Sequence, residues 1–179
     1  MKTSPVHISF ATVLLAVAGC ATSTVLSPPN VPGPLSVPAG QSAYVKALAT
    51  GVQIYECASK AAEPSAWSWT FRAPEATLAD PSGRPLGKHY AGPTWESLDG
   101  SVVVGQAKAS DPGTGPTAIP WLLLTTKSTT GKGLFAQTTS VQRVETVGGV
   151  APTEPCGAAN AKQVARVPYQ AAYYFYRAD

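Results

Sequence analysis

The side chains best suited to chemistry gather in one stretch of the chain, residues 87–105. Apart from His7 near the N-terminus, this stretch holds the only histidine. The candidate site residues are an imidazole, two aromatic rings and a carboxylate, namely His89, Tyr90, Trp95 and Glu96. An imidazole and a carboxylate can exchange protons, and flat rings offer a large contact area to a ligand. The sequence Ala-Gly-Pro at 91–93 predicts a turn that would fold His89 and Glu96 towards each other as a polar pair.

Two functions are compatible with this stretch. The first is a non-enzymatic binding or structural role, in which the four residues form one side of a surface for a small molecule, a glycan or a protein. The second is a secreted, hydrolase-like enzyme that uses His89 with Glu96 or Asp99. In a purely structural interpretation, His89 hydrogen-bonds a loop and Glu96 is a solvated strand residue. We expect the binding or structural role, because nothing in the spacing selects a catalytic set.

No complete cofactor or metal motif accompanies these residues. Residues 131–136 read GKGLFA and match G-x-G-x-x-A, but they lead into a β-rich segment, so they predict a hairpin turn. The sequence has no phosphate-binding loop and no G-x-S-x-G elbow. One histidine outside the leader cannot build a His-rich metal site, which leaves His89 with carboxylates as the alternative metal set. We therefore expect no cofactor and no metal.

The N-terminus predicts export and a lipid anchor. A basic start is followed by an apolar run over about residues 8–18, too short to span a membrane and typical of a signal peptide. Residues 17–20 read VAGC and resemble the lipobox of bacterial lipoproteins, which predicts a signal peptide over 1–19 and lipid on Cys20. Ala21 resembles the outer-membrane sorting pattern, so we expect an envelope protein held at the outer membrane. The alternative is ordinary cleavage after Ala18 and secretion with a free thiol.

The cysteines favour the same compartment. There are three in the chain, so acylation of Cys20 would leave Cys57 and Cys156 as a pair. Such a pair forms a disulfide in an oxidising compartment. A redox role is the alternative, but no C-x-x-C is present, so we expect a structural disulfide.

Composition divides the rest of the chain into a tether and one domain. Residues 20–36 are rich in Pro, Ser and Thr and carry no charge, which is typical of a flexible or polyproline-like tether. Residues 37–179 have the length of a single domain. The whole chain has 13 basic and 10 acidic residues without a Lys/Arg cluster, so we expect no nucleic-acid partner.

Short apolar runs broken by Gly, Pro and Asp predict an all-β domain, an antiparallel sandwich or barrel-like structure. Residues 94–96 and 102–104 predict a hairpin around Asp99 and Gly100. The apolar run 119–124 predicts a central strand with Pro120 at its entrance, and 172–176 predicts an interior strand. Trp67, Trp69 and Phe71 alternate with polar residues, so we expect them to face the core; a ligand platform is the alternative.

Several phrases also resemble a known family. They are VQIYEC (52–57), W-x-x-x-x-P-E-A-x-L (69–78), GKHYAGPTWE (87–96), DGS (99–101), IPWLLL (119–124), VQRVET (141–146) and VPYQAAYYFY (167–176). In this order they resemble a domain of unknown function found in secreted bacterial proteins and in fungal secreted or surface proteins. The resemblance implies an extracytoplasmic β-rich domain with the two cysteines and no assigned activity. Some fungal relatives are labelled malate dehydrogenase, but this sequence has no nucleotide-binding unit to carry that activity.

Overall fold

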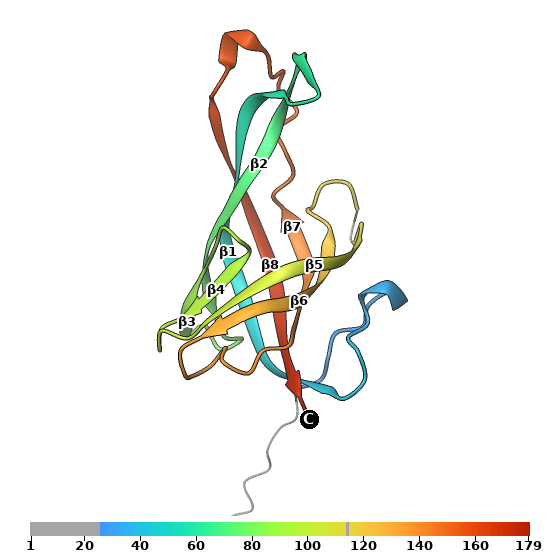
Figure 1. Cartoon of the computed structure of the whole chain (residues 1–179), viewed down its shortest axis with the longest axis vertical. Coiled ribbons are helices and arrows are strands. Elements are labelled where there is room, and N and C mark those ends of the chain that lie inside the picture. Colours follow the sequence, from blue (N-terminus) through green and yellow to red (C-terminus); the bar gives the residue numbers. More distant parts are fainter. Residues whose placement is uncertain (1–25, 114) are drawn as a thin grey trace, which may run out of the picture.

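The computed structural model describes residues 26–113 and 115–179, which fold into one antiparallel sheet closed as a barrel (Figure 1). The strands are β1 (Gln41–Lys60), β2 (Glu63–Ala79), β3 (Pro85–Tyr90), β4 (Thr94–Ser97), β5 (Val102–Asp111), β6 (Trp121–Thr130), β7 (Ser140–Gly148) and β8 (Val164–Ala178). Two short 3-10 helices are present, η1 (Gly33–Leu35) and η2 (Ala158–Asn160). The strands follow one another in chain order, and β8 pairs with β1 to close the barrel. The all-β, antiparallel prediction is confirmed, and of its two forms the barrel is the one observed.

Alternation along the strands separates the barrel interior from its outer surface. In β8, Ala171, Tyr173 and Phe175 belong to the interior cluster, whereas Ala172, Tyr174 and Tyr176 belong to a second buried cluster. The predicted interior strand over residues 172–176 is confirmed, because all five residues are buried. Pro120 directly precedes β6, as predicted for the residue that enters this strand.

The second cluster is covered by the N-terminal part of the described chain. Leu26, Val31 and Val37 pack against it, and Leu35 is fully buried. The Gln142 side chain donates a hydrogen bond of 2.6 Å to the Leu35 carbonyl. Part of the segment expected to be a tether, residues 26–36, therefore packs on the barrel. Residues 20–25, the signal peptide and Cys20 lie outside the described residues.

β1 and β2 continue past the barrel as a long arm, together with the first residues of β8 (Figure 1). Cys57 in the arm forms a disulfide with Cys156 in the loop between β7 and β8. The predicted disulfide is confirmed. The two cysteines are 99 residues apart, so in the chain-entropy model the bond stabilises the fold by about 4–5 kcal/mol. It holds the arm and this loop together.

The prediction that Trp67, Trp69 and Phe71 face the core is wrong. All three lie on the arm, where Phe71 is 49% exposed and both tryptophans are half-buried. The Trp69 indole N–H donates to the Glu154 carbonyl at 2.9 Å, so the loop between β7 and β8 covers part of this face. Alternation predicts that one face of a strand is apolar but cannot predict that a second layer covers it.

No helix long and apolar enough to cross a membrane occurs in residues 26–113 and 115–179.

Candidate ligand-binding site

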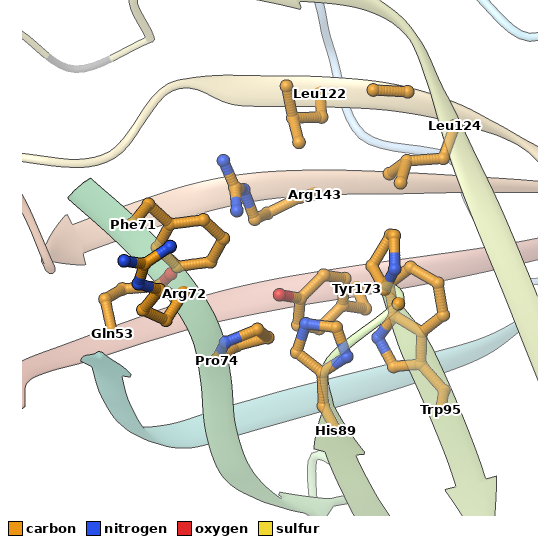
Figure 2. Close-up of a pocket in the computed structure, with 13 residues that line it drawn as sticks. Gln53, Phe71, Arg72, Pro74, His89, Trp95, Leu122, Leu124, Arg143 and Tyr173 are labelled. Carbon is orange, nitrogen blue, oxygen red and sulfur yellow. The ribbon is translucent and has the colours of Figure 1, made fainter. Parts of the chain in front are cut away.

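A cavity of about 270 Å³ opens at the end of the barrel from which the arm rises (Figure 2). Its lining comes from strands β1 to β8 and from the turn between β3 and β4. The lining residues are Gln53, Phe71, Arg72, Pro74, His89, Gly92, Pro93, Trp95, Ala107, Leu122, Leu124, Arg143 and Tyr173. Most of this surface is apolar, with a few polar groups that converge on it, which is the usual composition of a small-molecule site.

His89 and Trp95 form one wall of the cavity. They are directly opposed in the β3–β4 pair, and their side chains stack with ring centroids 4.6 Å apart. The imidazole also lies against Tyr173, at a centroid distance of 5.0 Å. Both wall residues are almost fully buried, His89 at 3% and Trp95 at 1% exposure. The stack fixes the position of the imidazole.

The His89 imidazole is neutral at physiological pH. Burial lowers its pKa to about 3, and the positive charge of Arg143 acts in the same direction, against the hydrogen bond to Thr94. Nδ1 lies 2.8 Å from the Thr94 carbonyl oxygen. Because a carbonyl can only accept, Nδ1 carries the proton of the neutral ring, and Nε2 is left as an acceptor.

Three buried polar atoms of the lining have no hydrogen-bond partner among the described residues. They are the Gln53 side-chain Nε2, the Trp95 indole Nε1 and the Tyr173 hydroxyl. Only six buried side-chain atoms are unpaired in the described part of the chain, so half of them cluster at this cavity. Leaving such a group unpaired costs about 1–3 kcal/mol. The cavity therefore offers bonds that a solvent or ligand molecule can complete.

Two arginines bring positive charge to the lining. The Arg143 Nε and Nη2 donate to the Pro120 carbonyl at 3.0 and 2.8 Å, and no carboxylate of a described residue forms an ion pair with Arg143. Arg72 pairs with Glu56 at 3.0 Å. No Asp or Glu belongs to the lining. The charge of Arg143 acts to lower the pKa of both His89 and Tyr173, so its field extends across the cavity.

Tyr90 and Glu96 lie away from this cavity. Each is adjacent in its strand to an inward residue, so its side chain points to the other face of the sheet. The Tyr90 hydroxyl donates to the Glu96 carboxylate at 2.8 Å, and Lys88 pairs with the same carboxylate at 3.2 Å. These contacts raise the pKa of Tyr90 and lower that of Glu96. The structure thus divides the four predicted site residues into two pairs, and His89 does not meet Glu96.

Asp99 belongs to the opposite end of the barrel. Its carboxylate accepts hydrogen bonds from the Ser101 N–H at 2.8 Å, the Ser101 hydroxyl at 2.6 Å and the Leu134 N–H at 2.7 Å. These donors, the Ser101 hydroxyl foremost, lower the pKa of Asp99 to about 2. The Ser101 hydroxyl in turn accepts from the Phe135 N–H at 3.0 Å. Phe135 is fully buried and stacks on Phe175, so Asp99 holds a loop that seals this end.

Sequence reasoning missed Gln53, Arg143 and Tyr173 as site residues. Arg143 gave one usable signal, because in the β-rich segment that follows residue 136 it alternates with Gln142 and Val144 and places a charge on the face shared with Val141. Gln53 and Tyr173 reach the site only because β8 returns to pair with β1. No local pattern predicts that pairing.

No group of three or more His, Cys, Asp or Glu side chains that could hold a metal ion occurs among the residues placed by the structure.

The fold and the cavity together define an antiparallel eight-stranded barrel that is sealed at one end and hollow at the other. The chain belongs to the family described as "Protein of unknown function (DUF3455)", which matches residues 38–177. No curated protein and no solved structure matches the chain.

Proposed function

We propose that this protein is a lipid-anchored, extracytoplasmic binding protein that holds a small molecule in the cavity beside His89. The observation that carries the proposal is the set of unpaired polar atoms of Gln53, Trp95 and Tyr173, buried to at least 98% and gathered around a hollow of about 270 Å³. Buried polar groups in proteins are nearly always hydrogen-bonded. A ligand that completes these bonds and covers the apolar walls would gain affinity from both.

The chemistry of the lining supports binding over catalysis. His89 is accompanied by no Ser, Thr, Cys, Asp or Glu in the lining, so neither a nucleophile nor an orienting carboxylate is at hand. A general base works best with a pKa near the operating pH, whereas that of His89 is about 3. The hydrolase alternative needs His89 beside Glu96 or Asp99, and these carboxylates are bonded elsewhere.

The anchor and location are supported by the N-terminal sequence. The VAGC motif supplies Cys20 for lipid attachment, and the Cys57–Cys156 disulfide suits an oxidising compartment such as the periplasm. The proposed partners are therefore the membrane, through lipid on Cys20, and a small molecule. Growth with labelled fatty acid tests the anchor: the wild-type protein should carry the label and Cys20→Ser should not. An unlabelled wild-type protein would remove the anchor from the proposal.

Blocking the cavity tests the binding function. Ala107 lies exposed at the cavity lining, so Ala107→Trp should fill the mouth without removing core contacts. Gln106→Trp is the matched control, because this neighbour is exposed but does not line the cavity. A ligand found by thermal-shift screening should raise the Tm of the wild type and of Gln106→Trp, but not that of Ala107→Trp. Equal shifts in all three proteins would place binding elsewhere and overturn the proposal.

A further inference from the structure

The three buried, unpaired atoms of the lining, those of Gln53, Trp95 and Tyr173, share one chemical property, which is that each can donate a hydrogen bond. His89 Nε2 is the acceptor beside them. An indole N–H has no acceptor function, and the unpaired Gln53 atom is the amide nitrogen. Burial raises the pKa of Tyr173, so its hydroxyl keeps its proton, although the charge of Arg143 and the polar groups of Tyr169 and Arg143 near the hydroxyl act to lower that pKa. Neither neighbour forms a hydrogen bond with it within 3.5 Å. A molecule that satisfies these three groups must therefore present acceptors.

Arg143 adds charge to this set of donors. Its guanidinium reaches the cavity from β7 and lies near Tyr173 and Leu122 in Figure 2. The Pro120 carbonyl accepts hydrogen bonds from Nε and Nη2 of Arg143, and the guanidinium has further N–H donors beyond these two. Its positive charge is not balanced by any carboxylate placed within 4.0 Å in the described chain. A planar guanidinium in this position is suited to a carboxylate, which it can bind through two parallel hydrogen bonds.

The apolar residues of the lining indicate what the rest of the ligand, its body, is made of. Phe71, Pro74, Trp95, Leu122 and Leu124 present apolar surface, and the His89–Trp95 stack makes one wall flat. The volume of about 270 Å³ is just below the usual range for ligand pockets, which begins at about 300 Å³. The space suits a compact apolar body, such as one aromatic ring or a short alkyl chain, and not a polar sugar.

We infer that the cavity binds a small organic monocarboxylate with an apolar body, and that Arg143 is the residue that binds the carboxylate. The inference rests on the proposed binding function and specifies its ligand class. The carboxylate accepts from Arg143 and from neighbouring donors of the lining, while the body packs against the flat His89–Trp95 wall. Arg72 lies at the rim of the cavity. It contributes less to anion binding than Arg143, because Glu56 already pairs with its charge.

Matched acid and amide probes test the charge requirement in the unmodified protein. Phenylacetate and phenylacetamide have the same ring and nearly the same shape but differ in charge. Isothermal titration of the full-length protein should show phenylacetate binding at least about tenfold more tightly, because a hydrogen bond to a charged group is stronger than to a neutral one. Hexanoate should bind as well, whereas acetate, which lacks the body, should not. Equal affinity for acid and amide would overturn this inference and leave the binding function intact.

Variants test the assignment to Arg143. Arg143→Gln should remove the preference for the acid, and Arg143→Lys, which keeps the charge but loses the planar fork, should retain part of it. Arg84→Gln is the matched control, because this arginine is 82% exposed and pairs with Asp80 in a turn away from the cavity. A full acid preference in Arg143→Gln would overturn the assignment. If none of the four probes binds, the monocarboxylate inference fails. If, in addition, no compound of any class stabilises the protein, the binding function fails with it.

Discussion

The two ends of the barrel are built from similar parts and differ in how completely those parts are satisfied. At the sealed end, Asp99 and Ser101 accept the N–H groups of the β6–β7 loop, and Phe135 fills the interior against Phe175. At the hollow end, His89 and Trp95 also stack, but buried donors beside them lack partners. The sealed end therefore contributes mainly to the stability of the fold, whereas the hollow end has groups free to interact with another molecule.

The largest effect should follow from emptying the sealed end. Phe135→Ala removes a fully buried ring that stacks on Phe175 at 4.5 Å, and should lower the free energy of unfolding by about 3–5 kcal/mol in urea denaturation. Phe71→Ala is the control at the hollow end, because that ring is 49% exposed. It should cost clearly less. Similar losses for both variants would contradict the contrast between the ends.

Acid should destabilise the protein through the hollow end before the sealed end responds. The folded-state pKa of His89, about 3, is below its unfolded value of 6.5, so between these values only the unfolded state takes up the proton. The free energy of unfolding should therefore decrease as the pH is lowered, by about 2 kcal/mol from pH 6.5 to about pH 5. The lowered pKa values of Glu96 and Asp99 add their losses below their unfolded values of 4.5 and 3.8.

Urea denaturation of His89→Gln across the same pH range isolates this contribution. The variant should lose most of the slope between pH 6.5 and about pH 5, while Glu96→Gln should keep it. An unchanged slope in His89→Gln would show that the imidazole is not buried as a neutral group.

A methyl group at Gly133 should loosen the sealing loop. The residue has φ +146°, and a Cβ there would lie 2.4 Å from the Asp99 carboxylate. Gly133→Ala should cost about 1–3 kcal/mol by overpacking and backbone strain. Gly83→Ala, at φ +86° in open space, controls for backbone strain alone and should cost less in thermal unfolding. Equal costs would show that the approach to Asp99 is unimportant.

The smallest effect is expected on the outer face. Tyr90→Phe breaks the hydrogen bond to Glu96 but touches neither end of the barrel. In calorimetric titration, the affinity of Tyr90→Phe for phenylacetate should equal that of the wild type within experimental error. A clear loss of affinity would show that Tyr90 and Glu96 take part in binding, although they lie outside the cavity.

The sequence predicted those features that depend on local pattern. The antiparallel β class and the disulfide followed from turn residues and cysteine parity. Residue type also drew attention to His89 and Trp95, which the structure stacks in the cavity wall. The grouping of His89 with Glu96 did not hold, because strand alternation places them on opposite faces. The arrival of Arg143 and Tyr173 at the same cavity depends on barrel closure, which is set by long-range pairing.

The indole N–H resonance of Trp95 gives the most direct test of the central claim that the hollow end is a binding site. The chain has four tryptophans, and Trp95→Phe would assign this one in a nuclear magnetic resonance spectrum. The indole N–H of Trp95 is unpaired and buried in the cavity wall, whereas that of Trp69 already donates to Glu154. On titration with phenylacetate, the Trp95 resonance should move in a saturable way while that of Trp69 stays in place. A Trp95 resonance that remains fixed while titration calorimetry shows phenylacetate saturating the protein would place the bound ligand elsewhere and contradict the account.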